Sequence, residues 1–456
     1  MADLDRAAPS VDDGRQVFGR PYVISWNLTY RCNLACEHCY LDAGGKPAVA
    51  TPAFADRSEL DTAACLRVVD EIAAFAPDGL LILTGGEPLL RRDIVEIIRH
   101  AAARELWVVV GTNGVKITDN LAAILKREGV RGLSLSLDAL DEARHDAFRR
   151  VTGAFRNTVE GARILARAGL PFIVQTTVGH HNVGELSAIA DYAYDALGAR
   201  VWNLYFLVPT GRGGHVSDLA DVEYDRVLAE LAVIQRRFAG RMLVNAKCAP
   251  HYVRILQGED PTSPFVKTYA DGAGGCPAGT HYLGIRPNGD VTPCPYLPLF
   301  GGNLRRESLG DVWRSSEVFV RIRDRGALGG RCGACELNAA CGGCRARAYG
   351  STGDLMAEDG LCTHQPGTLG APPRAPLVEY GADSMPAASV GEVAWDPDAR
   401  ARMKDIPAFV RGMVSRRVES YCREHGVARV TAELLGEIRA AMPTPKLFGA
   451  RRGESG

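Results

Sequence analysis

The sequence lacks the features that point to a membrane or to nucleic acid. No apolar run approaches the ~18–20 residues that span a bilayer, and residues 1–20 are polar, without the apolar core of a secretion signal. The formal net charge is only −1, so no excess of positive charge would attract nucleic acid or an anionic lipid surface. We therefore expect a cytoplasmic protein with no membrane span and no nucleic-acid partner.

Cysteine, by contrast, is abundant, with 13 residues in a chain of 456. Ten of them fall in two blocks, residues 32–39 and 276–362. In a reducing compartment such clustering indicates metal ligands rather than disulfides. Outside the blocks, Cys65 and Cys422 are expected to be small buried side chains. Cys248 stays open between three roles: a cluster ligand, a free thiol that faces substrate, and a residue without a special role.

The hydrophobic pattern predicts an α/β fold over residues 21–245, after a flexible N-terminus at 1–20. Six short apolar runs alternate with helix-length amphipathic segments, as in parallel strands covered on both faces. This pattern indicates a (βα)6 sheet, either an open TIM-like barrel or a doubly wound sheet, with its site at the carboxyl ends of the strands. The predicted strands are 22–28, 80–84, 106–111, 132–137, 171–178 and 201–208, and the predicted helices are 60–75, 93–104, 120–128, 156–168, 183–196 and 223–237.

The rest of the chain is divided by composition. Residues 246–364 are rich in Gly, Pro and Cys, so we expect little hydrophobic core there and stabilisation by metal clusters. Residues 365–394 have the Pro and Gly content of a linker. Residues 395–446 predict a small helical module, whose first helix begins at Asp396-Pro397 with an N-cap and an N1 proline.

The first cysteine block, Cys32-x3-Cys36-x2-Cys39, directly follows the first predicted strand. Three thiolates on one loop can hold three irons of a cubane cluster and leave the fourth iron open for a ligand. A structural zinc site would need a fourth ligand, and the nearby His38 is cramped beside Cys39.

The segment CNLACEHCY resembles the signature of the radical S-adenosylmethionine (SAM) superfamily. The resemblance implies a partial (βα)6 barrel, a [4Fe-4S] cluster on Cys32, Cys36 and Cys39, and cleavage of SAM at the open iron to a 5′-deoxyadenosyl radical. It also implies that the cluster receives its electron from a donor such as flavodoxin or ferredoxin. The residues that match SAM-contacting positions, each at or near the end of a predicted strand, are Tyr40, Gly85, Gly86, Glu87, Pro88, Asn113, Ser136 and Asp138.

The second block resembles the SPASM domain, which carries auxiliary [4Fe-4S] clusters in related enzymes. The resemblance implies two auxiliary clusters, and hence three clusters in all. One departure is the two-residue spacing Cys341-Gly-Gly-Cys344, where three residues are usual. Zinc ribbons are the alternative, because CxxC-x5-CxxC also fits zinc. The implied ligands are Cys276, Cys294 and Cys344, possibly with Cys248, for the first cluster, and Cys332, Cys335, Cys341 and Cys362 for the second.

Two segments associate the sequence with tetrapyrroles. Residues 341–362 resemble the tail of enzymes that mature heme and heme d1, and residues 406–426 resemble the C-terminal domain of a light-independent protochlorophyllide reductase subunit. The leading hypothesis is therefore side-chain modification of a tetrapyrrole, such as decarboxylation. Its carboxylates need cations, and Arg212 follows the sixth predicted strand; the other available arginines are Arg149, Arg150, Arg345 and Arg347.

Two other classes of function remain open. A peptide or protein maturase that installs a thioether or carbon–carbon crosslink would also use these clusters, although only about 20 residues precede the first predicted strand, which is short for a peptide-recognition module. A non-enzymatic zinc or iron–sulfur scaffold would leave the open cluster site and the GGEP turn at residues 85–88 without a role.

Overall fold

The structure is a computed structural model. It describes residues 19–44, 56–77, 79–216, 219–259, 275–369, 393–403, 406, 414–415, 418–419, 421–423 and 425–441. Nearly all of the predicted flexible N-terminus and most of the predicted linker lie outside these described residues.

Six parallel strands form the centre of the molecule, and each pairs with the next strand in chain order. A doubly wound sheet would reverse its strand order at one point, whereas this sheet does not. The fold is therefore the open, partial (βα)6 barrel, and the six predicted strands are confirmed. They are β1 (Val23–Asn27), β2 (Leu80–Thr84), β3 (Trp107–Thr112), β4 (Gly132–Ser136), β5 (Phe172–Val178) and β6 (Val201–Phe206).

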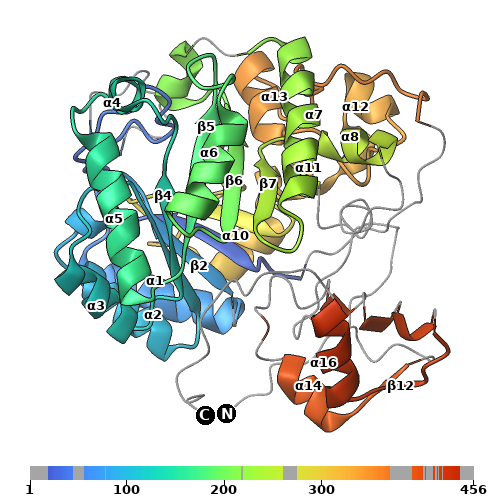
Figure 1. The fold of residues 1–456 in the computed structure, drawn as a ribbon, viewed down its shortest axis with the longest axis horizontal. Coiled ribbons are helices and arrows are strands. Elements are labelled where there is room, and N and C mark those ends of the chain that lie inside the picture. Colours follow the sequence, from blue (N-terminus) through green and yellow to red (C-terminus); the bar gives the residue numbers. More distant parts are fainter. Residues whose placement is uncertain are drawn as a thin grey trace.

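The helices that connect these strands bury one apolar face against the sheet, and Figure 1 shows several of them together along one side of the strands. The side chains of Asp61 and Thr118 cap α1 and α3 by accepting backbone N–H groups. Helix α4, which ends at Arg149, was not among the predicted helices. The helices are α1 (Thr62–Phe75), α2 (Ile94–Ala103), α3 (Asp119–Arg127), α4 (Glu142–Arg149), α5 (Ala154–Ala168), α6 (Leu186–Asp191) and α7 (Asp221–Arg237).

The sheet continues beyond the six strands at both edges. Strand β7 (Leu243–Lys247) pairs with β6, and β8 (Tyr282–Ile285) pairs with β1, both in parallel. Strands β9 (Asp290–Thr292) and β10 (Gly302–Asn303) follow β8 in antiparallel pairing. The resulting order is β10-β9-β8-β1-β2-β3-β4-β5-β6-β7.

The expectation of little hydrophobic core after residue 246 is wrong. Leu283, Ile285, Trp313 and Phe319 are buried in the same hydrophobic core as the barrel strands. A second core surrounds buried cysteines in the SPASM region. The helices of this part are α8 (Tyr252–Glu259), α10 (Leu309–Ser315), α11 (Glu317–Arg323), α12 (Gly330–Ala334) and α13 (Arg345–Thr352).

The C-terminal module has a small core of its own, around Trp395, Met403 and Cys422. As predicted, its first helix, α14 (Pro397–Met403), begins at the proline. Strands β11 (Ala394–Trp395) and β12 (Arg429–Val430) pair in parallel, and α16 (Ala432–Ala441) follows. Cys65 and Cys422 are both fully buried, as expected. Among the described residues, no helix combines the length and apolar character needed to cross a membrane.

Candidate functional site

One large cavity lies at the inner face and carboxyl ends of the barrel strands. Its wall includes the three-cysteine loop, the turns after β2 and β3, and the segment around Tyr296 that follows β9. The residues that carry the argument below are Cys32, Cys36, His38, Cys39, Tyr40, Gly85, Gly86, Asn113, Ser136, Arg149, Tyr205, Arg212, Tyr282 and Tyr296.

Cys32, Cys36 and Cys39 all face this cavity. The backbone N–H of Leu34 donates to Cys32 Sγ over 3.4 Å, and that of Ala43 donates to Cys39 Sγ over 3.4 Å. Burial raises the pKa of the Cys32 thiol to about 12, so this thiol ionises only if a cation compensates the charge. N–H donors aimed at sulfur and thiols that need a cation fit an iron–sulfur cluster.

Arg149 and Asp138 form a buried ion pair beside the loop. Arg149 Nε donates to Asp138 Oδ2 over 2.6 Å, and its Nη1 lies 3.6 Å from Cys36 Sγ. Burial acts to raise the pKa of Asp138, but Arg149, the neighbouring histidines and the Thr177 N–H together outweigh it and hold this pKa at about 2. Asp138 does not line the cavity; Arg149 does, and it brings a positive charge to the Cys36 sulfur.

The GGEP turn brings bare backbone to the cavity. A Cβ atom on Gly86 would lie 2.2 Å from the carbonyl oxygen of Arg31, so only glycine fits there. Glu87 is fully buried and accepts hydrogen bonds from Thr112 Oγ1 at 2.9 Å and from the Asn113 N–H at 2.9 Å. Glu87 therefore ties the turn to the end of β3 from behind, and Pro88 lies behind the cavity with it. Gly85 and Gly86 form the wall itself.

The other predicted SAM contacts that line the cavity are Tyr40, Asn113 and Ser136. Tyr40 donates its hydroxyl to Asn27 Oδ1 over 2.7 Å, and its ring centroid lies 4.6 Å from that of Tyr296. Asn113 Nδ2 donates to Asn33 Oδ1 over 2.9 Å, which joins the third strand to the cysteine loop.

The structure also brings in residues that sequence reasoning missed. His38 lines the cavity, and its ring stacks on Phe148 with centroids 4.4 Å apart. Tyr205, Tyr282 and Tyr296 also line the cavity, and Tyr282 and Tyr296 pack against the buried cluster that contains Cys276, Cys294 and Cys344. Tyr205 could have been found, because it alternates with core residues in the predicted sixth strand.

Arg212 is tied to the cysteine loop. Its Nε donates to the Cys36 carbonyl and its Nη2 to the Ala43 carbonyl, each over 2.9 Å. Gly211 allows this approach, because a Cβ there would lie 2.5 Å from the Cys39 carbonyl oxygen. Arg212 Nη1 has no partner among the described residues.

The remaining arginines are placed away from the cavity. Arg150 is on the surface beside Glu37, at 3.3 Å. Arg345 and Arg347 are buried in the SPASM region, where Arg345 Nη1 donates to the carbonyls of Leu355 and Ala357.

A second cysteine group lies next to the tyrosines. Cys276, Cys294 and Cys344 share one buried cluster, and Cys248 packs against it. Cys248 Sγ hydrogen-bonds to Cys344 and interacts with Cys294. Its backbone adopts a φ of +59°, unusual for a residue other than glycine, which turns the side chain into this group. Four thiols converge here, as a complete [4Fe-4S] site requires.

A buried salt bridge between Arg347 and Asp359 lies beside this group. Arg347 donates to Asp359 Oδ2 over 3.0 Å and to the Cys248 carbonyl over 2.7 Å. Asp359 in turn accepts the Cys344 N–H over 2.8 Å. These bonds fix the backbone of Cys248 and Cys344 relative to each other.

The third cysteine group surrounds a smaller cavity lined by Cys332, Cys335, Cys341 and Cys362. Backbone N–H groups again point at sulfur: Leu337 to Cys335 at 3.3 Å, Gly343 to Cys341 at 3.4 Å, and Asp359 to Cys332 at 3.4 Å. Burial raises the pKa of the Cys335 thiol to about 11. The donors and the desolvated thiols fit a second auxiliary cluster.

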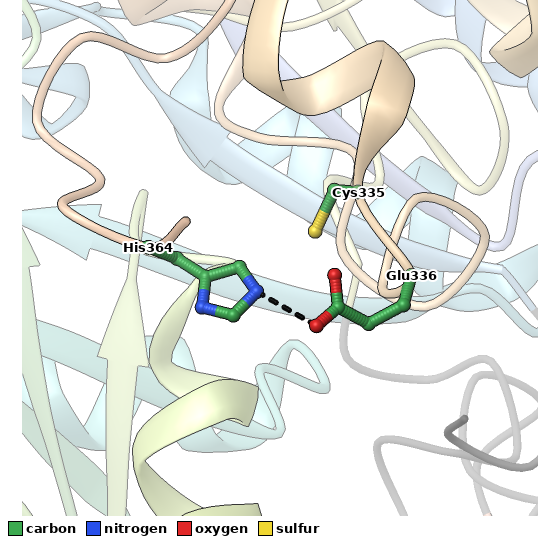
Figure 2. A group of neighbouring side chains, drawn as sticks. All are labelled: Cys335, Glu336 and His364. Atoms are coloured by element: carbon green, nitrogen blue, oxygen red, sulfur yellow. Dashed lines mark hydrogen bonds and ion pairs between the residues drawn. The ribbon is translucent and has the colours of Figure 1, made fainter. Parts of the chain in front are cut away.

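Cys335, Glu336 and His364 lie close enough together to suggest a separate metal site (Figure 2). The carboxylate of Glu336 is already occupied, however. It bonds His364 Nε2 at 3.1 Å and accepts the N–H groups of Gly367 at 2.9 Å and Leu369 at 3.0 Å. Glu336 thus holds the chain that follows Cys362.

The fold and the site define an iron–sulfur enzyme whose first cluster keeps one iron open for a ligand. Three family models match the chain: the radical SAM superfamily over residues 26–193, the SPASM iron–sulfur cluster-binding domain over 276–344, and the proto-chlorophyllide reductase 57 kD subunit over 395–439. The chain belongs to the radical SAM superfamily: it binds a [4Fe-4S] cluster with SAM, and its SPASM domain binds auxiliary iron–sulfur clusters.

Among curated relatives, the AdoMet-dependent heme synthase of Methanosarcina barkeri (strain Fusaro / DSM 804) is 38% identical over 352 residues, which cover 76% of this chain and 97% of the relative. The AdoMet-dependent heme synthase of Nitratidesulfovibrio vulgaris (strain Hildenborough) is 37% identical over 354 residues, covering 75% and 92%. Among solved structures, Streptococcus suis SuiB bound to its precursor peptide SuiA superposes with a TM-score of 0.60 at 18% identity, covering 76% of each chain. At that identity the likeness to SuiB shows the fold alone.

Proposed function

We propose that the protein decarboxylates the propionate side chains of an iron tetrapyrrole, a reaction compatible with its similarity to proteins named AdoMet-dependent heme synthases. The observation that carries this proposal is the 38% identity to a heme synthase along 97% of that relative. The C-terminal match to a protochlorophyllide reductase subunit is a second association with tetrapyrroles, in a different part of the chain. The peptide-bound structure resembles this chain at only 18% identity and supports no peptide substrate.

The bound cluster and SAM would supply a 5′-deoxyadenosyl radical that takes a hydrogen atom from the substrate. We assign this cluster to Cys32, Cys36 and Cys39, which the Arg212 and Ala43 contacts hold in one loop. Gly85 and Gly86 would present backbone carbonyls to the SAM ammonium group, and Tyr40, Asn113 and Ser136 would line the rest of its site. Arg149 would pair with the SAM carboxylate beside Cys36.

The substrate would occupy the side of the cavity bounded by Tyr205 and Tyr296. Among the arginines considered for the substrate carboxylates, Arg149 and Arg212 line the cavity, and Arg212 Nη1 is the donor without a protein partner. Arg212 is therefore the proposed contact for a propionate. A propionate becomes a vinyl group by losing a hydrogen atom, CO2 and one further electron, so the site needs an electron acceptor.

The auxiliary clusters would supply that acceptor. We assign the first to Cys248, Cys276, Cys294 and Cys344 and the second to Cys332, Cys335, Cys341 and Cys362. The four cysteines assigned to the first auxiliary cluster lie next to the cavity, beside Tyr205 and Tyr296. We further propose a flavodoxin or ferredoxin as the electron donor, and the cytoplasm as the location, because none of the 13 cysteines forms a disulfide, as is usual in a reducing compartment.

Anaerobic reconstitution with iron and sulfide tests this proposal. We expect about twelve irons per chain, four for each of three clusters. With SAM, a reductant and iron-coproporphyrin, each converted side chain should lose one CO2 and two hydrogen atoms by mass spectrometry, with one 5′-deoxyadenosine formed. Substrate-independent deoxyadenosine production, with iron-coproporphyrin unchanged, would refute the tetrapyrrole proposal.

Matched cysteine variants distinguish loss of a cluster ligand from a general effect on the fold. Cys36→Ala should abolish SAM cleavage, whereas Cys65→Ala removes a buried thiol outside every cysteine group and should leave SAM cleavage intact. Cys248→Ala should lower the iron content if Cys248 is a ligand. Unchanged iron and unchanged spectra in Cys248→Ala would remove this cysteine from the assigned ligands.

A further inference from the structure

Two glycines, Gly342 and Gly343, link Cys341 to Cys344, so the link has no side chain of its own to fill the space beside it. Both of its glycines have a positive φ, +67° at Gly342 and +60° at Gly343. A Cβ atom on Gly342 would lie 1.3 Å from Arg325 Nη1, so any side chain at this position would displace the guanidinium. The two-glycine link therefore makes room for Arg325 directly against the third cysteine group.

Arg325 is attached to both auxiliary cysteine groups. It opens a short 3-10 helix (Arg325–Ala327) just after α11, and its Nη2 donates to the carbonyl of Cys276 over 3.1 Å. Its own carbonyl accepts from Asn338 Nδ2 over 3.2 Å, and the same amide donates to the Cys332 carbonyl over 3.0 Å. Arg325 is thus tied to one proposed ligand of each group, to Cys276 by its side chain and to Cys332 by its backbone carbonyl through Asn338.

The guanidinium of Arg325 is buried, and its charge is not compensated by a carboxylate. Nε and Nη1 have no hydrogen-bond partner, and no acidic side chain pairs with Arg325 in the part of the chain that the structure describes. Burial lowers the pKa of Arg325, while the thiolates of Cys276 and Cys341 act in the opposite direction. A buried cation without a counter-ion is strongly unfavourable. The anionic groups within its reach are the cysteine sulfurs.

We propose that Arg325 is a positioning residue for electron transfer, which donates its free N–H groups to sulfur atoms of the two auxiliary clusters and raises their reduction potentials. Reduction adds a negative charge to a cluster, so a nearby cation favours the reduced form. Hydrogen bonds to cluster sulfur have the same effect. Arg325 thereby makes the auxiliary clusters better electron acceptors.

Two neighbouring arginines have surroundings different from those of Arg325. Arg347 has the carboxylate of Asp359 at 3.0 Å, which offsets its charge. Arg323, two residues before Arg325, donates to the Gly279 carbonyl over 2.7 Å and lies over the Trp313 ring. It is a half-buried arginine that faces an aromatic core, and it is the matched control.

A potentiometric titration followed by EPR measures the effect on the reconstituted full-length enzyme. The auxiliary signals are identified by repeating the titration with Cys32, Cys36 and Cys39 changed to Ala. For Arg325→Met we expect the ratio of reduced to oxidised auxiliary cluster at a fixed potential to fall about tenfold, which is 59 mV for a one-electron couple. Arg325→Lys keeps the charge but loses the forked donors, so its shift should be smaller.

The controls distinguish this tuning from a structural role. Arg323→Met should leave the midpoint potentials unchanged, and Gly342→Ala, which displaces the guanidinium without removing it, should lower them as Arg325→Met does. Full iron content with unchanged midpoints in Arg325→Met would overturn the proposal. Loss of auxiliary iron from every Arg325 variant, Lys included, would also overturn it in favour of a role in cluster assembly.

This inference rests on the auxiliary clusters and not on the identity of the substrate. A potential shift in Arg325→Met with no conversion of iron-coproporphyrin would leave it standing while the proposed function fails. Conversion of iron-coproporphyrin with no potential shift in Arg325→Met would overturn the inference and leave the proposed function standing.

Discussion

Replacing Glu87 with Gln should stabilise the protein at alkaline pH. Glu87 is fully buried, and burial raises its pKa from 4.5 to about 7, although the N–H of Asn113, the N–H of Leu89 and the Thr112 hydroxyl act to lower it. A carboxyl group whose pKa is higher in the folded state holds its proton more tightly there. Its contribution to stability is complete below pH 4.5 and is lost as the pH rises towards 7.

The size of the effect follows from the pKa. One pKa unit corresponds to about 1.36 kcal/mol, so the rise from 4.5 to about 7 corresponds to roughly 3 kcal/mol. Glutamine keeps an oxygen that can accept from Thr112 and Asn113 but does not ionise. The stability of Glu87→Gln relative to the wild type should therefore increase by about 3 kcal/mol between pH 4.5 and pH 8.

Urea unfolding without SAM, at pH 5 and at pH 8, measures this difference. Tryptophan fluorescence reports on the barrel, because Trp26, Trp107 and Trp202 lie in β1, β3 and β6. Glu160→Gln, at a half-exposed position on α5, is the control and should show no comparable dependence on pH. Equal stability differences at both pH values would show that Glu87 is ionised throughout, and the reasoning would be wrong.

Three further predictions concern other parts of the molecule. Asp138→Asn leaves the buried Arg149 without its counter-ion, so urea unfolding should show a loss of about 3–5 kcal/mol, and titration calorimetry should show weakened SAM binding. Gly86→Ala places a methyl group 2.2 Å from the Arg31 carbonyl oxygen, so SAM affinity should fall at least tenfold in the same calorimetric assay; unchanged affinity would contradict the close approach. Removal of residues 393–456, whose described part has a core of its own, should leave dithionite-driven SAM cleavage within twofold, as measured by deoxyadenosine release.

The barrel was predictable from the sequence because parallel strands covered on both faces are nearly continuous apolar runs. The strands 80–84 and 201–208 are of this kind, and both are present in the structure. Strand β7 escaped prediction because its residues, LVNAK, are short and half polar, with one fully buried side chain. Helix α4 escaped because EARHDAFR has a polar composition, and its buried polar residues bind groups outside the helix rather than belonging to an apolar stripe.

Some parts of the candidate site could be predicted from the sequence and others could not. The resemblance to the radical SAM and SPASM patterns assigned the cysteines to groups, although Cys276 and Cys344 are far apart in the chain. The convergence of Cys248 with Cys344 depends on contacts between residues nearly a hundred positions apart, which no local pattern records. The hydrogen bonds that Glu87 and Asp138 accept behind the cavity could not be predicted either. A motif gives the position of a residue in the sequence, but not the groups that donate hydrogen bonds to its side chain.

The pairing of β1 with β8 has a mechanical consequence. The loop that carries the three front cysteines leaves the end of β1, and the segment that carries Cys294 follows β8 and β9 in the same sheet. Backbone hydrogen bonds of one continuous ladder thus join the strand before the Cys32 loop to the strands before Cys294. Because electron tunnelling depends steeply on separation, this ladder would hold constant the distance between the two proposed cluster sites.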